Sequence, residues 1–111
     1  MQLELKTWAY DILTAIQEIE TFLLDVPDFT SYQVDLKTKR AIERNLEIIG
    51  EAVNRMLNLQ EDLPFTDARK IVDTRNRRII HGYDSVSDEV IWSIVTSNLP
   101  TLRLQVEAFL G

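Results

Sequence analysis

The chain of 111 residues has no cysteine, only one histidine, and three residues each of glycine and proline. Without cysteine it can form neither a disulfide nor a thiolate metal site, which agrees with a cytoplasmic setting. No apolar run approaches the roughly 18 residues of a membrane span. The first residues, MQLELKTWAYD, lack the basic and apolar regions of a secretory signal. We therefore expect a soluble cytoplasmic protein without a membrane segment.

Apolar residues recur at helical spacing, and no stretch shows the alternation of a strand. Length and pattern predict one all-α domain over residues 1–111, an up-and-down bundle of four main helices. Pro100 should kink or split the last helix near residues 97 and 98. The expected helices cover residues 3–25, 36–57, about 67–81, and a last stretch capped by Ser85 or Ser87.

The formal net charge of −6 conceals one basic segment. Residues 69–83 contain five basic residues against one acidic residue, a local charge of +4 that leaves −10 for the rest of the chain. A basic face on an acidic body can steer a polyanion to one place, because exposed charges farther apart than about 10 Å are largely screened. An ordinary solvated helix face is the alternative interpretation.

Residues 74–84, TRNRRIIHGYD, lie in this basic segment. The six consecutive polar residues 73–78 sweep more than a full turn of a helix, so at least one of them must face the protein. A cation in that position is costly unless an anion or a partner meets it. The pattern therefore predicts a functional site in this stretch.

The single histidine, His81, and the arginines before it could perform phosphoryl chemistry without a metal. A histidine with a pKa of about 6.5 exchanges protons at neutral pH, and arginine binds phosphate and balances the charge of a transition state. RNA supplies its own nucleophile, the 2′-hydroxyl, so a base, an acid and a cation suffice. One histidine without cysteine or clustered carboxylates predicts no metal site, and no motif predicts a cofactor. A histidine that merely caps the helix is the alternative.

The spacing from Arg75 to His81 resembles the R-x(4–6)-H motif of HEPN domains. Together with RNLEIIGEAVNRM at residues 44–56 and with HGYD, it is similar to HepT-type toxins of HEPN/MNT toxin–antitoxin pairs, and the resemblance covers nearly the whole chain. It implies a HEPN-like bundle and a metal-independent endoribonuclease toxin with a composite site across a homodimer. It also implies an MNT-type nucleotidyltransferase antitoxin that silences the toxin by attaching AMP to a tyrosine, here Tyr83.

The resemblance implies that Arg75 and His81 are the catalytic pair and that Asn76 is the polar residue following the arginine. Arg77 and Arg78 would support the site or bind RNA. Five residues separate Arg75 from His81, one more than usual in this family, which rotates the arginine by about a further 100° on an ideal helix. Either a π-bulge restores the usual geometry, or another arginine takes the role; we expect Arg75 to act.

The first helix carries a second apolar row at Ala9, Ile16 and Leu23. The two rows together are wider than one neighbouring helix needs, which suggests a second buried surface between protomers. Two other functions remain open. A non-catalytic HEPN adaptor would dock a nucleotidyltransferase or bind nucleotide. A plain dimerisation module would use its arginines in ion pairs between protomers.

Overall fold

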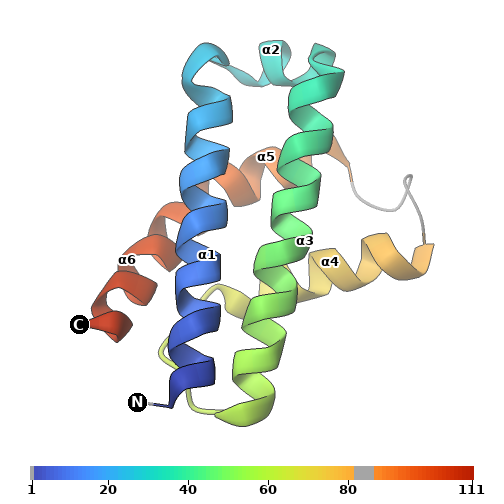
Figure 1. The fold of residues 1–111 in the computed structure, drawn as a ribbon. Coiled ribbons are helices and arrows are strands. Elements are labelled where there is room, and N and C mark those ends of the chain that lie inside the picture. The colour runs from blue at the N-terminus through green and yellow to red at the C-terminus, as the bar shows by residue number, and fades with distance from the viewer. Residues whose placement is uncertain (1, 82–86) are drawn as a thin grey trace.

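The structure, a computed structural model, describes the backbone of residues 2–81 and 87–111 and the side chains of residues 2–74 and 87–111. Within these ranges every regular element is helical (Figure 1). Four helices have 12 or more residues, so the prediction of an all-α protein with four main helices is confirmed. Over the described residues, no helix combines the length and apolar character needed to cross a membrane. The helices are α1 (Leu3–Phe22), α2 (Phe29–Val34), α3 (Leu36–Leu59), α4 (Ala68–His81), α5 (Asp88–Ser93) and α6 (Leu99–Leu110).

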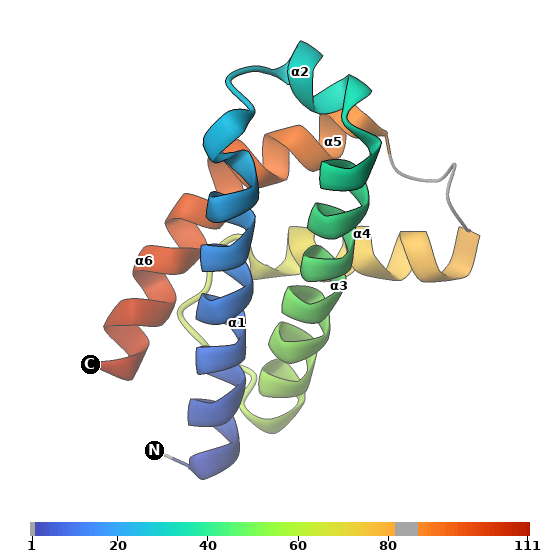
Figure 2. The ribbon, with the colours of Figure 1, turned by 45° about the horizontal axis from the view of Figure 1, so that its top comes forward.

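Helices α1 and α3 lie side by side and run in opposite directions, as both ribbon views show (Figures 1 and 2). Helix α4 packs against α3 and crosses behind it, whereas α6 packs against α1. The short helix α2 bridges the top of the molecule, where it contacts α3 and α5. The core lies between these layers, so α4 is held mainly by α3.

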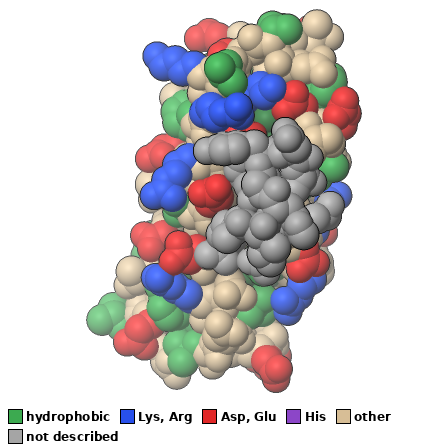
Figure 3. All heavy atoms as spheres, turned by 90° about the vertical axis from the view of Figure 1, so that its right-hand side faces the viewer, with side chains coloured by type: hydrophobic (Ala, Val, Ile, Leu, Met, Phe, Trp, Pro, Cys, Tyr) green, Lys and Arg blue, Asp and Glu red, His purple; other side chains and the backbone are tan. Residues whose placement is uncertain are grey.

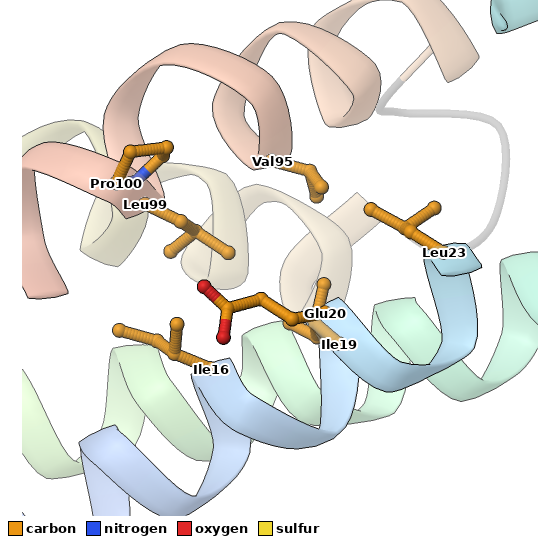
Figure 4. Close-up of a pocket in the computed structure, with 7 residues that line it drawn as sticks. All are labelled: Ile16, Ile19, Glu20, Leu23, Val95, Leu99 and Pro100. Carbon is orange, nitrogen blue, oxygen red and sulfur yellow. The ribbon is translucent and has the colours of Figure 1, made fainter. Parts of the chain in front are cut away.

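Both apolar rows of α1 are used within one chain. Ala9 and Ile16 of the second row are buried, and Leu23 is half-buried at the end of the helix. Figure 4 shows Leu23 directed towards Val95 and Ile16 on the side of Leu99, around a cavity of about 70 Å³. The last helices therefore account for the width of this surface, which is no longer an argument for a dimer.

Carboxylates fix the starts of two helices. Asp35 precedes α3 and accepts hydrogen bonds from the backbone N–H of Thr38 at 3.1 Å and from its hydroxyl at 2.7 Å. Asp28 caps α2 in the same way, by accepting from the backbone N–H of Ser31 at 2.8 Å. These bonds favour the ionised carboxylate, so each aspartate has a pKa below its ordinary value.

The last helix begins at the predicted cap and changes form before the proline. Ser87 accepts a hydrogen bond from the backbone N–H of Val90 at 3.2 Å. Pro100 has no N–H to continue the α-helical ladder. The preceding segment Ile94–Asn98 is a π-helix, in which the N–H of Leu99 donates to the carbonyl five residues earlier. The predicted split near the proline is thus confirmed, and its form is a wider turn between α5 and α6.

Candidate active site on helix α4

The first half of α4 has a well-defined inner face. Its buried side chains are Ala68, Ile71, Val72 and Thr74. The hydroxyl of Thr74 donates to the carbonyl of Lys70 at 2.8 Å, so this buried polar group is satisfied by its own helix. The exposed residues of the same stretch are Arg69, Lys70 and Asp73. The basic segment therefore begins with its charges facing outward.

The backbone of α4 is α-helical at every residue from Ala68 to His81, including the stretch between the predicted arginine and histidine. Six steps of about 100° place the positions of Arg75 and His81 about 120° apart around the axis and about 9 Å apart along it. No π-bulge absorbs the additional residue within this described backbone, whereas a π-helix is present before Pro100. Positions 77 and 78 are the ones a single turn before His81.

The inner face, continued along the helical period, passes through the positions of Arg75 and Arg78. Position 75 falls between Ile71 and Val72 around the axis, and position 78 falls between Thr74 and Ile71, whereas position 77 continues the exposed side. Figures 1 and 2 show that the second half of α4 extends past α3, away from α1. The side chains of residues 75–81, and residues 82–86 with Gly82 and Tyr83, lie outside the described part. The assignments of Arg75, Asn76, Arg77, Arg78, His81 and Tyr83 stay predictions.

The chain beyond the motif is fastened to α2 and α3. Lys39 Nζ of α3 donates to Asp88 Oδ2, in the first turn of α5, at 2.9 Å, and both side chains are largely buried. Trp92 of α5 packs on the buried Tyr32 of α2, with ring centroids 5.3 Å apart. Since α4 also packs on α3, both helices that flank residues 82–86 are anchored to the same support.

Two polar side chains of α3, Glu43 and Asn45, are buried, which the sequence pattern did not predict. Glu43 is buried, with 6% of its surface exposed, and accepts a hydrogen bond from Arg40 at 2.8 Å. Asn45 is also buried, and its amide donates to the carbonyl of Ala15 in α1 at 3.2 Å. Four basic residues gather in the first nine residues of the helix, at Lys37, Lys39, Arg40 and Arg44. Charge counted separately for each predicted helix would have revealed this second basic segment.

Two hollows among the described residues lie away from α4. An open groove of about 390 Å³ is lined by Trp8, Arg55, Asn58 and Leu59. Neither this groove nor the cavity in Figure 4 is lined by a residue of α4. Among the described residues, no three side chains of His, Cys, Asp or Glu lie close enough to hold a metal ion.

This chain is an all-helical bundle, and its arginine-rich helix α4 ends at the only histidine. These features place it in a class of small helical proteins with a candidate phosphate-binding site. Residues 12–109 match the family described as "Ribonuclease HepT-like", and the chain belongs to this HepT-like ribonuclease family. The resemblance inferred from the sequence is therefore confirmed. The prediction of a ribonuclease is confirmed at the level of the family.

Similar proteins occur in archaea and bacteria. The chain is 33% identical over 106 residues to "Probable ribonuclease HepT" of Thermococcus cleftensis, covering 92% of each chain. It is 31% identical over 108 residues to "Putative RNase MJ0127" of Methanocaldococcus jannaschii, covering 94% of this chain and 85% of the relative. A third relative, "Putative RNase TTE0752" of Caldanaerobacter subterraneus, is 32% identical over 98 residues, covering 86% of this chain and 87% of its own. No solved structure matches the chain.

Proposed function

We propose that this chain is an endoribonuclease toxin that cleaves RNA without a metal, at a composite site built by two copies. A nucleotidyltransferase antitoxin neutralises it by attaching AMP to Tyr83. The observation that supports the proposal most, besides family membership, is the regular backbone of α4. Because positions 75 and 81 lie about 120° apart around the axis of one helix, two copies can combine the pair more readily than one can. The inner-face position of Arg75, on the half of α4 that extends past α3, agrees with a partner at this place.

The chemistry needs only groups that such a dimer supplies. His81 takes the proton of a 2′-hydroxyl, and the 2′-oxygen attacks the adjacent phosphorus. The bond from phosphorus to the 5′-oxygen breaks, and His81, which was protonated in the first step, gives that proton to the departing oxygen. Arg75 balances the additional negative charge on the phosphate oxygens in the transition state. The products are a 2′,3′-cyclic phosphate and a 5′-hydroxyl end.

Modification of Tyr83 would act on the same phosphate site. The tyrosine oxygen attacks the α-phosphorus of ATP, and pyrophosphate leaves. The attached AMP is bulky and anionic, and Tyr83 is two residues from His81 in sequence. It would exclude an RNA phosphate by its size and by like charge. A mass measurement on the chain co-expressed with the antitoxin should find AMP on Tyr83, and Tyr83→Phe should abolish both the modification and the neutralisation.

Cleavage of RNA in the presence of EDTA tests the enzyme. His81→Ala and Arg75→Ala should each lower cleavage by about 100-fold or more, because the proton-transfer group or the phosphate cation is lost. Their far-UV circular dichroism should stay that of the parent. Arg69→Ala removes an exposed arginine from the first half of the same helix and serves as the matched control.

The outcomes separate the possible roles. Unchanged cleavage by both His81→Ala and Arg75→Ala would refute the proposed site. Loss of RNA cleavage in Arg77→Ala or Arg78→Ala, with full activity in Arg75→Ala, would assign the phosphate-binding role to that arginine instead of Arg75. Absence of cleavage together with stable binding to a nucleotidyltransferase would favour the adaptor function.

A further inference from the structure

The basic residues of this acidic chain are concentrated in two segments. Four of the twelve lie in residues 36–44 and five in residues 69–83. The first segment starts α3, and the second forms most of α4, which packs against α3. The fold therefore packs the helix that begins with the first cationic segment against the helix that carries the second, although the two segments are 25 residues apart in sequence.

Three of the basic residues on α3 form a stripe. Lys37, Arg40 and Arg44 are spaced i, i+3 and i+7, which places them on one face of the helix over about 10 Å. All three are exposed, and the side chains of Arg40 and Arg44 are 51% and 71% exposed. We call these residues the α3 basic stripe.

The charge on the same face of α3 changes from positive to negative further along the helix. Glu47 and Glu51 follow the stripe at the next helical turns, and Arg55 lies beyond them with its guanidinium 2.6 Å from Glu51. The α3 basic stripe is therefore limited to the first half of the helix. Arg55 provides an exposed arginine on the same helix but outside the stripe.

Existing ion pairs leave the stripe's charge available. Arg40 pairs with Glu43 at 2.8 Å and Arg44 with Glu47 at 3.8 Å. The surface pair of Arg44 with Glu47 contributes about 0–1 kcal/mol, so a phosphate can compete for the Arg44 guanidinium. Arg40 can meet a phosphate with its exposed part while it stays paired with the buried Glu43. Lys37 is exposed in the first turn of α3, one turn before Arg40.

The chain that joins the motif to α5 limits the distance between the end of the motif and the start of α3. Lys39, between Lys37 and Arg40, binds Asp88 at 2.9 Å. Only seven residue steps join His81 to Asp88, which limits their separation to about 25 Å. Figure 3 views the molecule from the side to which the end of α4 points, and Lys and Arg side chains gather in the upper part of this face.

We propose that the phosphate backbone of the RNA runs from α4 across the α3 basic stripe, so that Lys37, Arg40 and Arg44 bind phosphates outside the cleavage site. The choice of RNA as the occupant rests on the proposed function. A linear polyanion fits a single row of exposed cations, because most protein contacts to nucleic acid go to phosphate oxygens and come largely from arginine and lysine. Such contacts position the strand and read no base sequence.

The test is binding of a fluorescein-labelled single-stranded RNA, measured by fluorescence anisotropy in EDTA. All proteins carry His81→Ala, so the RNA stays intact. The double variant Lys37→Gln/Arg44→Gln retains the pair between Arg40 and the buried Glu43. Its affinity at 0.1 M salt should fall by about five- to tenfold, and the slope of log K against log salt should drop by about 1.4, or 0.7 for each lost contact. Arg55→Gln should bind as the His81→Ala parent does.

The outcomes distinguish this inference from the proposed function. Unchanged affinity and salt slope in the double variant, with normal circular dichroism, overturn the inference, even if the wild-type chain cleaves RNA. Weakened RNA binding in the double variant supports it, even if the wild-type chain cleaves nothing. If the double variant binds RNA normally but no longer binds the nucleotidyltransferase, the stripe is a protein-binding surface and the inference is wrong.

Discussion

The ion pair between Lys39 and Asp88 is the side-chain link that fastens the start of α5 to α3, 49 residues earlier in the chain. Lys39→Met removes the charge and retains most of the apolar stem, whereas changing Asp88 also removes an acid from the first turn of α5. The side chains are 17% and 24% exposed, between the surface pairs worth about 0.2–1 kcal/mol and the buried pairs whose disruption costs about 3–5 kcal/mol. We expect Lys39→Met to lower the free energy of unfolding by about 1–2 kcal/mol.

For a domain of this size, that loss corresponds to a melting temperature lower by about 4–8 °C. Thermal unfolding followed by circular dichroism, on a double-mutant cycle of Lys39→Met and Asp88→Asn, isolates the coupling between the two side chains. The control cycle uses Arg55 and Glu51, a pair on the surface of α3 whose side chains are 56% and 47% exposed. It should give a coupling below about 0.5 kcal/mol.

The cycle also tests whether the pair positions the motif. Because α5 begins seven residues after His81, loosening it should lower RNA cleavage several-fold at a temperature well below the melting transition of the variant. The charge-reversed double variant, Lys39→Asp/Asp88→Lys, should recover part of the cleavage. A coupling at this pair no larger than that of the control pair would refute the reasoning.

Three further substitutions test the scaffold by urea titration. Asn45→Ala removes amide hydrogen bonds to α1, including one to Glu18 at 2.9 Å, and should cost about 1–3 kcal/mol; a loss below about 0.5 kcal/mol would contradict this. Ile49→Ala truncates a fully buried core residue and should cost about 2–5 kcal/mol, and a smaller loss would mean that the core collapses around the site. Hydrogen bonds from Thr38 hold the pKa of Asp35 below 3.8, so its stabilising effect is complete above that pH and is lost as the pH falls through the lower folded-state pKa. Asp35→Asn should therefore reduce the decrease in the free energy of unfolding at acid pH. The same decrease in the variant and in the wild-type chain would contradict this assignment.

The helices could be predicted because their signals are local. The proline after α1, the cap at Ser87 and the apolar periodicity each depend on a few neighbouring residues. The form of the break before Pro100 could not be predicted, since a kink, a restart and a π-helix all accommodate a missing N–H. The wide apolar surface of α1 suggested an interface between protomers, because periodicity shows that a face is apolar and does not show which element covers it.

The candidate site could be predicted only in part, because a sequence pattern does not show which residues meet after folding. The basic motif is a local pattern, so its place at the end of α4 could be predicted. The pair of Lys39 with Asp88 and the burial of Glu43 depend on residues that meet only after folding. The regular backbone between Arg75 and His81 was one of two open possibilities, because the choice between an α-helix and a π-bulge depends on packing around α4.

The most direct test of the composite site is complementation between two inactive variants. In a dimer that combines one Arg75→Ala copy with one His81→Ala copy, one of the two symmetric sites regains both wild-type side chains. Mixing the two variants under conditions that allow subunit exchange, and then measuring RNA cleavage in EDTA, should restore about a quarter of the wild-type rate if exchange is random. No gain over the separate variants, with heterodimers demonstrated by native mass spectrometry, would contradict a site shared between copies.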